Sequence, residues 1–121
     1  MTTEELVNRL VELVKEGKNL QAEEELYAQD ILSVEQNGYS ATGLEAVMAK
    51  TKGAMDGIET FHGGGITEVF IGKDNFLLTF ELDVTHKGGS RVQMKEYGFY
   101  KVKDGKVTEE YFFMEPTDFS K

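Results

Sequence analysis

Glu96 is the residue whose setting most strongly suggests chemistry. Between Arg91 and Val102 apolar side chains alternate with charged ones, and Glu96 stands in the apolar row. The other members of that row are Val92, Met94, Gly98, Tyr100 and Val102. A carboxylate on the core face of a sheet costs free energy unless it is hydrogen bonded or lines a cavity. The pattern therefore predicts a pocket with a polar floor, in which Glu96 is either functional or a structural carboxylate tied to a buried Tyr or His.

Three apolar or aromatic residues are expected to line this pocket as ligand contacts. Met94 and Tyr100 share the face of Glu96, and Tyr100 offers a hydroxyl to a ligand or to that carboxylate. Phe80 belongs to a second alternating run, from Asn75 to His86, which has one apolar and one more polar face. Such alternation is typical of a sheet that packs one face against helices.

Two further side chains are candidates for acid and base chemistry. His62 precedes the triplet Gly63 to Gly65, and imidazole titrates near neutral pH. A lone His beside a bend can also be merely hydrogen bonded. Glu35 ends a short β-rich run before Asn37-Gly38, where it is either a solvated carboxylate or a pocket residue.

The residue pattern predicts neither a metal site nor a bound cofactor. The two His and the scattered carboxylates have no recognisable ligand spacing. The stretch GIETFHGGG lacks the Lys and the helix start of a phosphate loop. No grouping of Ser, His and acid suggests a nucleophile.

Composition narrows the class of protein further. The 121 residues suit one domain, and the absence of Cys excludes disulfides and thiolate chemistry. A net charge of -9 without a basic stripe argues against nucleic acid or an anionic membrane as partner. No apolar run approaches the roughly 20 residues that span a bilayer, and the acidic N-terminus does not resemble a secretory signal. We therefore expect a cytoplasmic domain.

Hydrophobic periodicity and turn signals predict three helices followed by a sheet. Capping-box spacing opens a helix at Thr2 to Glu5 and another at Thr42 to Glu45, whose apolar side would include Met55. Between them a short helix is expected, with its Glu23-Glu24-Glu25 run facing solvent. The predicted strands are 30–36, 59–71, 75–86, 90–102 and 106–115. The glycine triplet is expected to form a bulge, and Asp104-Gly105 is expected to form a two-residue hairpin turn.

This order of elements resembles the nuclear transport factor 2-like superfamily, which includes ketosteroid isomerases and SnoaL-like polyketide cyclases. The segments that carry the likeness are YAQDILSVE (27–35), GLEAVMA (43–49) and YKVKDGKVTEEYFF (100–113). The resemblance implies an α+β fold, a cone-shaped curved antiparallel sheet packed against three N-terminal helices, with a pocket inside. It also implies a homodimer through the outer sheet face, for which Phe99 and Phe112 lie on suitable strands.

The resemblance implies roles for Glu35 and His62, but two catalytic residues of ketosteroid isomerases have no counterpart in this sequence. Glu35 falls where ketosteroid isomerases carry their general base. Gly98 falls where they carry a protonated acid, so Glu96 could substitute only from another depth, and the first helix lacks their catalytic Tyr. In polyketide cyclase relatives a His on the strand of His62 contributes to the pocket. Steroid isomerisation is therefore not expected.

Two functions remain open from the sequence. The first is cofactor-independent acid and base catalysis, of isomerase, cyclase or hydratase type, on a small apolar or carbonyl-bearing molecule, with Glu35, Glu96 and His62 as catalytic candidates. The alternative is a domain that binds a small ligand without chemistry, or that dimerises and keeps a vestigial pocket.

Overall fold

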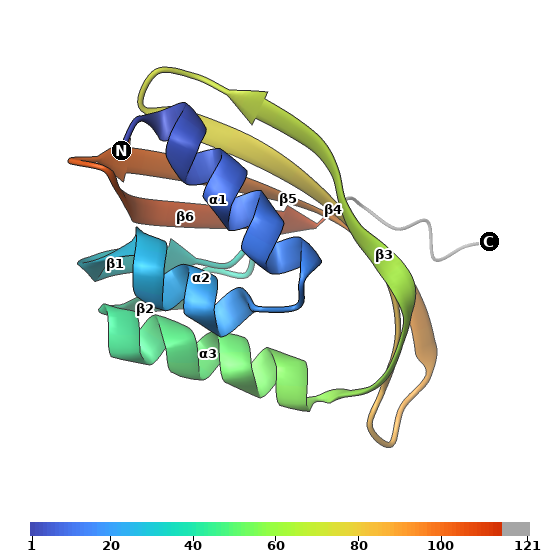
Figure 1. The fold of residues 1–121 in the computed structure, drawn as a ribbon. Helices are drawn as coiled ribbons and strands as arrows, with labels where there is room; N and C mark the ends of the chain where they lie inside the picture. Colours follow the sequence, from blue (N-terminus) through green and yellow to red (C-terminus); the bar gives the residue numbers. More distant parts are fainter. Residues whose placement is uncertain (115–121) are drawn as a thin grey trace.

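The computed structural model describes residues 1–114, in which three helices pack on one face of a curved six-stranded sheet (Figure 1). The helices are α1 (Thr3–Lys15), α2 (Asn19–Leu26) and α3 (Leu44–Asp56). The strands are β1 (Tyr27–Val34), β2 (Ser40–Thr42), β3 (Ile58–Ile71), β4 (Asn75–His86), β5 (Arg91–Lys103) and β6 (Lys106–Met114). The predicted α+β fold is confirmed. Within the described residues, no helix is both long and apolar enough to cross a membrane.

The two predicted capping boxes have different outcomes. At α1 the Glu5 N–H donates to Thr2 Oγ1 at 3.1 Å, and the Thr2 N–H donates to Glu5 Oε1 at 2.8 Å, which confirms the first. The second is wrong, because Thr42 pairs with Leu32 as part of β2 and Gly43 caps α3 without a side-chain bond. Met55, expected on the apolar side of α3, is 39% exposed.

The sheet is mixed, whereas the sequence analysis predicted a sheet that is antiparallel throughout. Its strand order is β2-β1-β6-β5-β4-β3, and every pair is antiparallel except β1 with β6. The parallel pair arises because the long meander from β3 to β6 returns the chain beside β1. The last hairpin turns at Asp104 and Gly105, with φ of 54° and 74°, as its sequence predicts. The predicted strand end at Glu115 lies outside the described residues.

Glycine allows β3 to bend around the sheet. The pairing of β3 with β4 shifts register between Phe61 and Gly63, which confirms the predicted bulge. Gly64 has a φ of 112°, and a Cβ there would lie 2.0 Å from the Glu81 carbonyl oxygen. Only glycine fits this close approach, so the bend is specified by the sequence.

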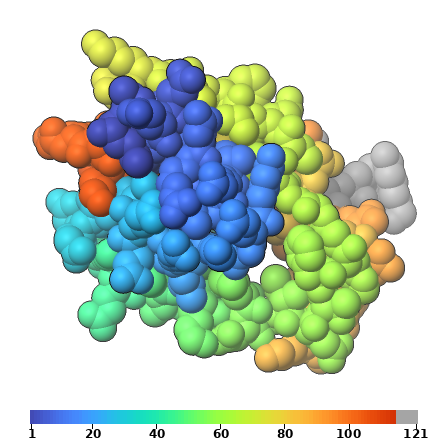
Figure 2. Space-filling view, viewed as in Figure 1, coloured from blue at the N-terminus to red at the C-terminus, as the bar shows by residue number. Residues whose placement is uncertain are grey.

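The interior between helices and sheet has a closed end and a more open end. At the closed end Phe76, Leu78 and Val107 are at most 1% exposed and pack with α1 residues such as Leu6. Toward the other end Ile66, Phe80 and Phe112 are only partly buried. Figure 2 shows the surface hollowed between α3 and β3. Side chains that face inward in this region are accessible enough to meet a ligand.

Candidate functional site

A connected set of polar side chains crosses the interior. The Lys50 ammonium on α3 donates to Ser33 Oγ at 2.6 Å and to Glu35 Oε2 at 3.1 Å. Ser33 of β1 lies opposite Glu110 of β6, and its hydroxyl donates to the Glu110 carboxyl. The Tyr27 hydroxyl donates to the same carboxyl. We call these five residues the interior polar network.

The network runs from a buried end to a partly exposed end. Glu110 is 1% exposed, and burial raises its pKa although Tyr27 and Ser33 hydrogen bond to it. At the other end the side chains of Lys50 and Glu35 are 18% and 35% exposed. The Lys50 ammonium also lies 5.1 Å from the centre of the Phe112 ring. The ion pair of Lys50 and Glu35 therefore stands where a ligand can reach it.

Glu96 faces this ion pair from β5. It lies opposite Phe80 on β4, so both side chains point to the interior as the sequence predicts. Burial, and then repulsion from Glu35, raises the pKa of Glu96 to about 7, and the Lys50 charge opposes the shift. Within residues 1–114, neither the Glu96 carboxyl nor the Tyr100 hydroxyl has a hydrogen-bond partner. Both polar groups are thus available to a ligand.

Glu23 also belongs to the interior, against the sequence prediction that its acidic run faces solvent. Its side chain on α2 is buried, with 7% of the residue exposed, whereas Glu24 and Glu25 are exposed. The Thr51 hydroxyl donates to Glu23 Oε2 at 2.6 Å, while Oε1 is buried and has no hydrogen-bond partner in the described part of the chain. Burial and the nearby Glu110 raise the pKa of Glu23 to about 7. Consecutive residues of a helix point in different directions, so Glu23 can face the interior while Glu24 and Glu25 face solvent.

The predicted ligand contacts divide between the two ends of the interior. Tyr100 is 3% exposed at the closed end, where its ring stacks on Phe76 at 4.5 Å and meets Phe112 edge-on at 6.0 Å. Phe80 and Met94 lie on the inner faces of β4 and β5 and are partly exposed. The structure therefore brings Glu35, Glu96, Phe80, Met94 and Tyr100 to one interior.

His62 is placed apart from this group. Its Nε2 lies 2.7 Å from Thr85 Oγ1 in an exposed setting, and its charge acts on Asp83, which is ion paired with Arg91 at 2.8 Å. Thr85 and Asp83 alternate with the inward-facing Val84, so they lie on the outer face of the sheet. Within residues 1–114, no three carboxylate or imidazole groups are placed to hold a metal ion.

Comparison with known families identifies the chain. The model of the SnoaL-like domain family matches residues 1–114. The chain belongs to this SnoaL-like family. The predicted resemblance is therefore confirmed at the level of the family, while no curated protein matches the chain in sequence.

Solved structures share the fold of this SnoaL-like domain. A proposed SnoaL-like polyketide cyclase from Mesorhizobium loti is 39% identical, with a TM-score of 0.86, over 93% of this chain and 99% of that one. A second proposed cyclase of this kind, from Jannaschia, is 18% identical with a TM-score of 0.80, over 93% and 85%. A protein of ketosteroid isomerase-like fold from Catenulispora acidiphila, in complex with trimethylamine, is 21% identical with a TM-score of 0.73, over 93% and 86%.

Lys50, Ser33, Glu110 and Tyr27 of the SnoaL-like domain were missed by the sequence analysis. Two of them had a usable signal. Ser33 alternates with the buried Ile31 along β1, and Lys50 follows Val47 by three positions on α3, which places each on an inward face. A lysine at such a position suggests an internal anion partner, which Glu35 provides.

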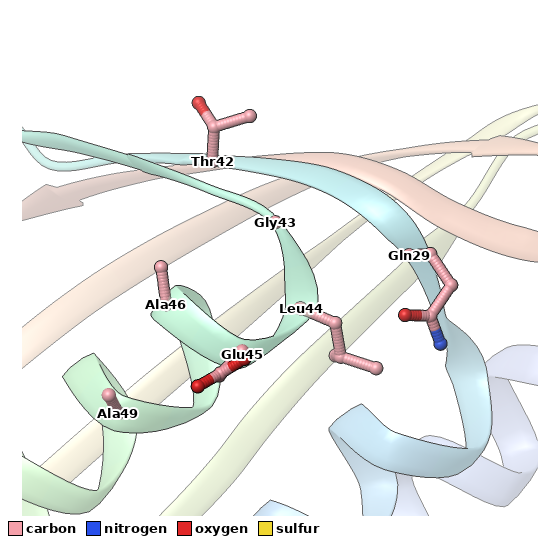
Figure 3. Close-up of a pocket in the computed structure, with 7 residues that line it drawn as sticks. All are labelled: Gln29, Thr42, Gly43, Leu44, Glu45, Ala46 and Ala49. Atoms are coloured by element: carbon pink, nitrogen blue, oxygen red, sulfur yellow. The ribbon is translucent and has the colours of Figure 1, made fainter.

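The SnoaL-like domain also has a shallow surface hollow at the start of α3 (Figure 3). Its lining consists of Gln29, Thr42, Gly43, Leu44, Glu45, Ala46 and Ala49. It contains none of the predicted site residues and none of the interior polar network. We therefore place the candidate site in the interior.

Proposed function

We propose that this SnoaL-like domain catalyses proton transfer on a small, apolar, carbonyl-bearing molecule without a cofactor, as an isomerase, cyclase or hydratase-type enzyme. The observation that carries this proposal is the meeting of two carboxyl groups with different surroundings. Glu35 is ion paired with Lys50 at 3.1 Å, whereas Glu96 has no such partner among residues 1–114 and its pKa is raised to about 7. Paired acids held in unlike environments suit the roles of base and acid.

Each residue then has a distinct task. Glu35 takes a proton from a carbon next to the carbonyl group, and Lys50 and Ser33 hold its position. Glu96, neutral below about pH 7, donates a hydrogen bond to the carbonyl oxygen, and the Tyr100 hydroxyl is a second donor. Phe80 and Met94 contact the apolar body of the molecule. His62, on the outer face, receives no task.

Deuterium exchange into small cyclic ketones in D2O tests this function. By proton NMR, the domain is expected to accelerate exchange next to the carbonyl of cyclohexanone or cyclopentenone. Glu35→Gln should lower the rate by about 10²- to 10⁴-fold, the usual contribution of a general base. Glu24→Gln, which changes an exposed acid of α2, should leave the rate unchanged.

The pH profile of the same assay isolates Glu96. The rate should fall as pH rises through about 7, where Glu96 loses its proton, and Glu96→Gln should remove this fall because the amide stays neutral. Equal rates for wild type and Glu35→Gln would refute the proposal. Binding of a ketone without exchange would support the alternative, a non-catalytic binding module, which Gly98 favours because it lacks the acid of related isomerases.

We also propose that two copies pair through the outer face of the sheet. Phe70, Leu77, Phe99 and Tyr111 lie opposite one another in one row across β3 to β6. Phe70 is 57% exposed, and Phe113 beside this row is 50% exposed. An exposed apolar patch of this kind marks an interaction surface. Phe112, by contrast, faces the interior.

Sedimentation velocity at micromolar concentration tests the pairing. The wild type should sediment as a dimer, and Phe70→Glu should give a folded monomer because it places a charge in the paired surface. Phe61→Glu is the matched control, since Phe61 is 58% exposed on the same strand but lies outside the row. A monomeric wild type would contradict the proposal.

A further inference from the structure

The Tyr100 ring occupies the space that a side chain at position 98 would fill. A Cβ added to Gly98 would lie 2.7 Å from Tyr100 Oη, 2.8 Å from Cε1 and 2.9 Å from Cζ. The ring therefore runs back along β5 over Gly98, and its hydroxyl points toward Glu96. Any larger residue at 98 would displace this ring, because real Cβ atoms do not approach other atoms so closely.

Packing holds the ring in this position. Tyr100 stacks on Phe76 with 8° between the ring planes, and Phe112 contacts it edge-on. Phe76 and Tyr100 are 1% and 3% exposed, so the stack fills the closed end of the interior. Aromatic pairs in these geometries are favourable beyond the area they bury. These contacts on two sides fix the orientation of the ring over Gly98.

Open space for a ligand therefore begins at the Tyr100 hydroxyl. Beyond the ring lie Val107 and Glu110, each at most 1% exposed, and the buried Leu78 lies opposite Gly98. On the near side Phe80, Met94, Glu96 and Phe112 are partly exposed. Glu96 is two residues from Gly98, about 7 Å along the strand, so the space between the Tyr100 hydroxyl over Gly98 and the Glu96 carboxyl suits about one ring.

We infer that Tyr100, seated on Gly98, sets the depth of the pocket and restricts the ligand to about the size of a single ring. Tyr100 is then the residue that determines size specificity, and Gly98 is the residue that permits it. This inference rests on the proposed function for the place of the ligand beside Glu35 and Glu96. It adds the class of molecule: a monocyclic or similarly small ketone or phenol, with its oxygen toward Tyr100 and Glu96.

Binding of two neutral phenols at pH 6, measured by calorimetry or ligand NMR, tests the inference without turnover. Wild type should bind phenol and bind 2-naphthol at least about tenfold more weakly. Tyr100→Ala should reverse this order, because removal of a buried ring leaves a cavity that accepts apolar molecules. Tyr100→Phe keeps the ring and should keep the preference for phenol.

A second variant keeps the test decisive if Tyr100→Ala does not fold. Gly98→Ala should push the Tyr100 ring into the open space and weaken phenol binding at least about tenfold in a folded protein. Equal affinity of wild type for the two probes, binding of neither, or unchanged phenol binding in Gly98→Ala would each overturn the inference. Failure of the ketone exchange assay with size selection intact would overturn only the proposed catalysis.

Discussion

Glu110→Ala is expected to destabilise the domain by about 3 kcal/mol or more, because it leaves two buried hydroxyls without their acceptor and opens a cavity. Tyr27 and Ser33 both donate to this carboxyl, and Glu110 and Ser33 are 1% and 0% exposed. Glu110→Gln keeps an acceptor oxygen and should stay within about 1 kcal/mol of wild type. Urea unfolding at pH 6 measures both variants.

A neighbouring residue supplies the control for this prediction. Glu109 is adjacent on β6 but is not buried, and its carboxyl accepts from the Tyr111 hydroxyl. Glu109→Ala should therefore cost about 1 kcal/mol or less. A contribution of the interior polar network to stability would be contradicted if Glu110→Ala had the same free energy of unfolding as wild type. It would also be contradicted if Glu110→Gln were as unstable as Glu110→Ala.

The free energy of unfolding is expected to fall as pH rises from about 4.5 to about 7. Glu23 and Glu96 have pKa values of about 7 in the folded domain, raised first by burial from an ordinary value of 4.5. Between those values the folded state holds more protons than the unfolded state, so its stability decreases as pH rises. The total decrease in the free energy of unfolding should be about 3 kcal/mol. This is less than the two full pKa shifts would give, because solvent screens the partly exposed Glu96.

Denaturant unfolding across this pH range checks the sign and the origin of the effect. Glu23→Gln and Glu96→Gln should each flatten part of the profile, because an amide does not ionise. Asp83→Asn should lower stability by the same amount at every pH from 4.5 to 7 and leave the slope there unchanged, since Arg91 holds the pKa of Asp83 at about 2 and its charge is lost by protonation only at lower pH. A profile that is flat or rising from 4.5 to 7 would exclude buried neutral carboxyls.

The fold was predictable wherever the signal is local. The capping box at Thr2 and the turn at Asp104-Gly105 each depend on neighbours within a few residues, and both are confirmed. The pairing of β1 with β6 and the three-residue β2 depend on contacts distant in sequence. Such contacts leave no periodic pattern, which is why Thr42 was assigned to a helix cap instead of a strand.

The site was predictable in part for a similar reason. Glu96 follows a regular alternation along β5, so its inward face could be deduced. Lys101 pairs with Glu109 and Val102 pairs with Val107, so β6 has one extra residue between these two pairs. Strict alternation counted from the buried Val107 would therefore predict, wrongly, that Glu110 faces outward. One extra residue in a strand thus concealed the most buried acid of the interior.

The parallel pairing of β1 with β6 has a consequence for synthesis of the protein. Tyr27 and Glu110, which meet in the interior, are 83 positions apart in the chain. Until β6 leaves the ribosome, β1 and β5 lack the strand that lies between them in the sheet. The helices can then pack only against an incomplete sheet. The last strand to emerge therefore completes the domain, and a nascent chain that stalls before it exposes two unpaired edges open to aggregation.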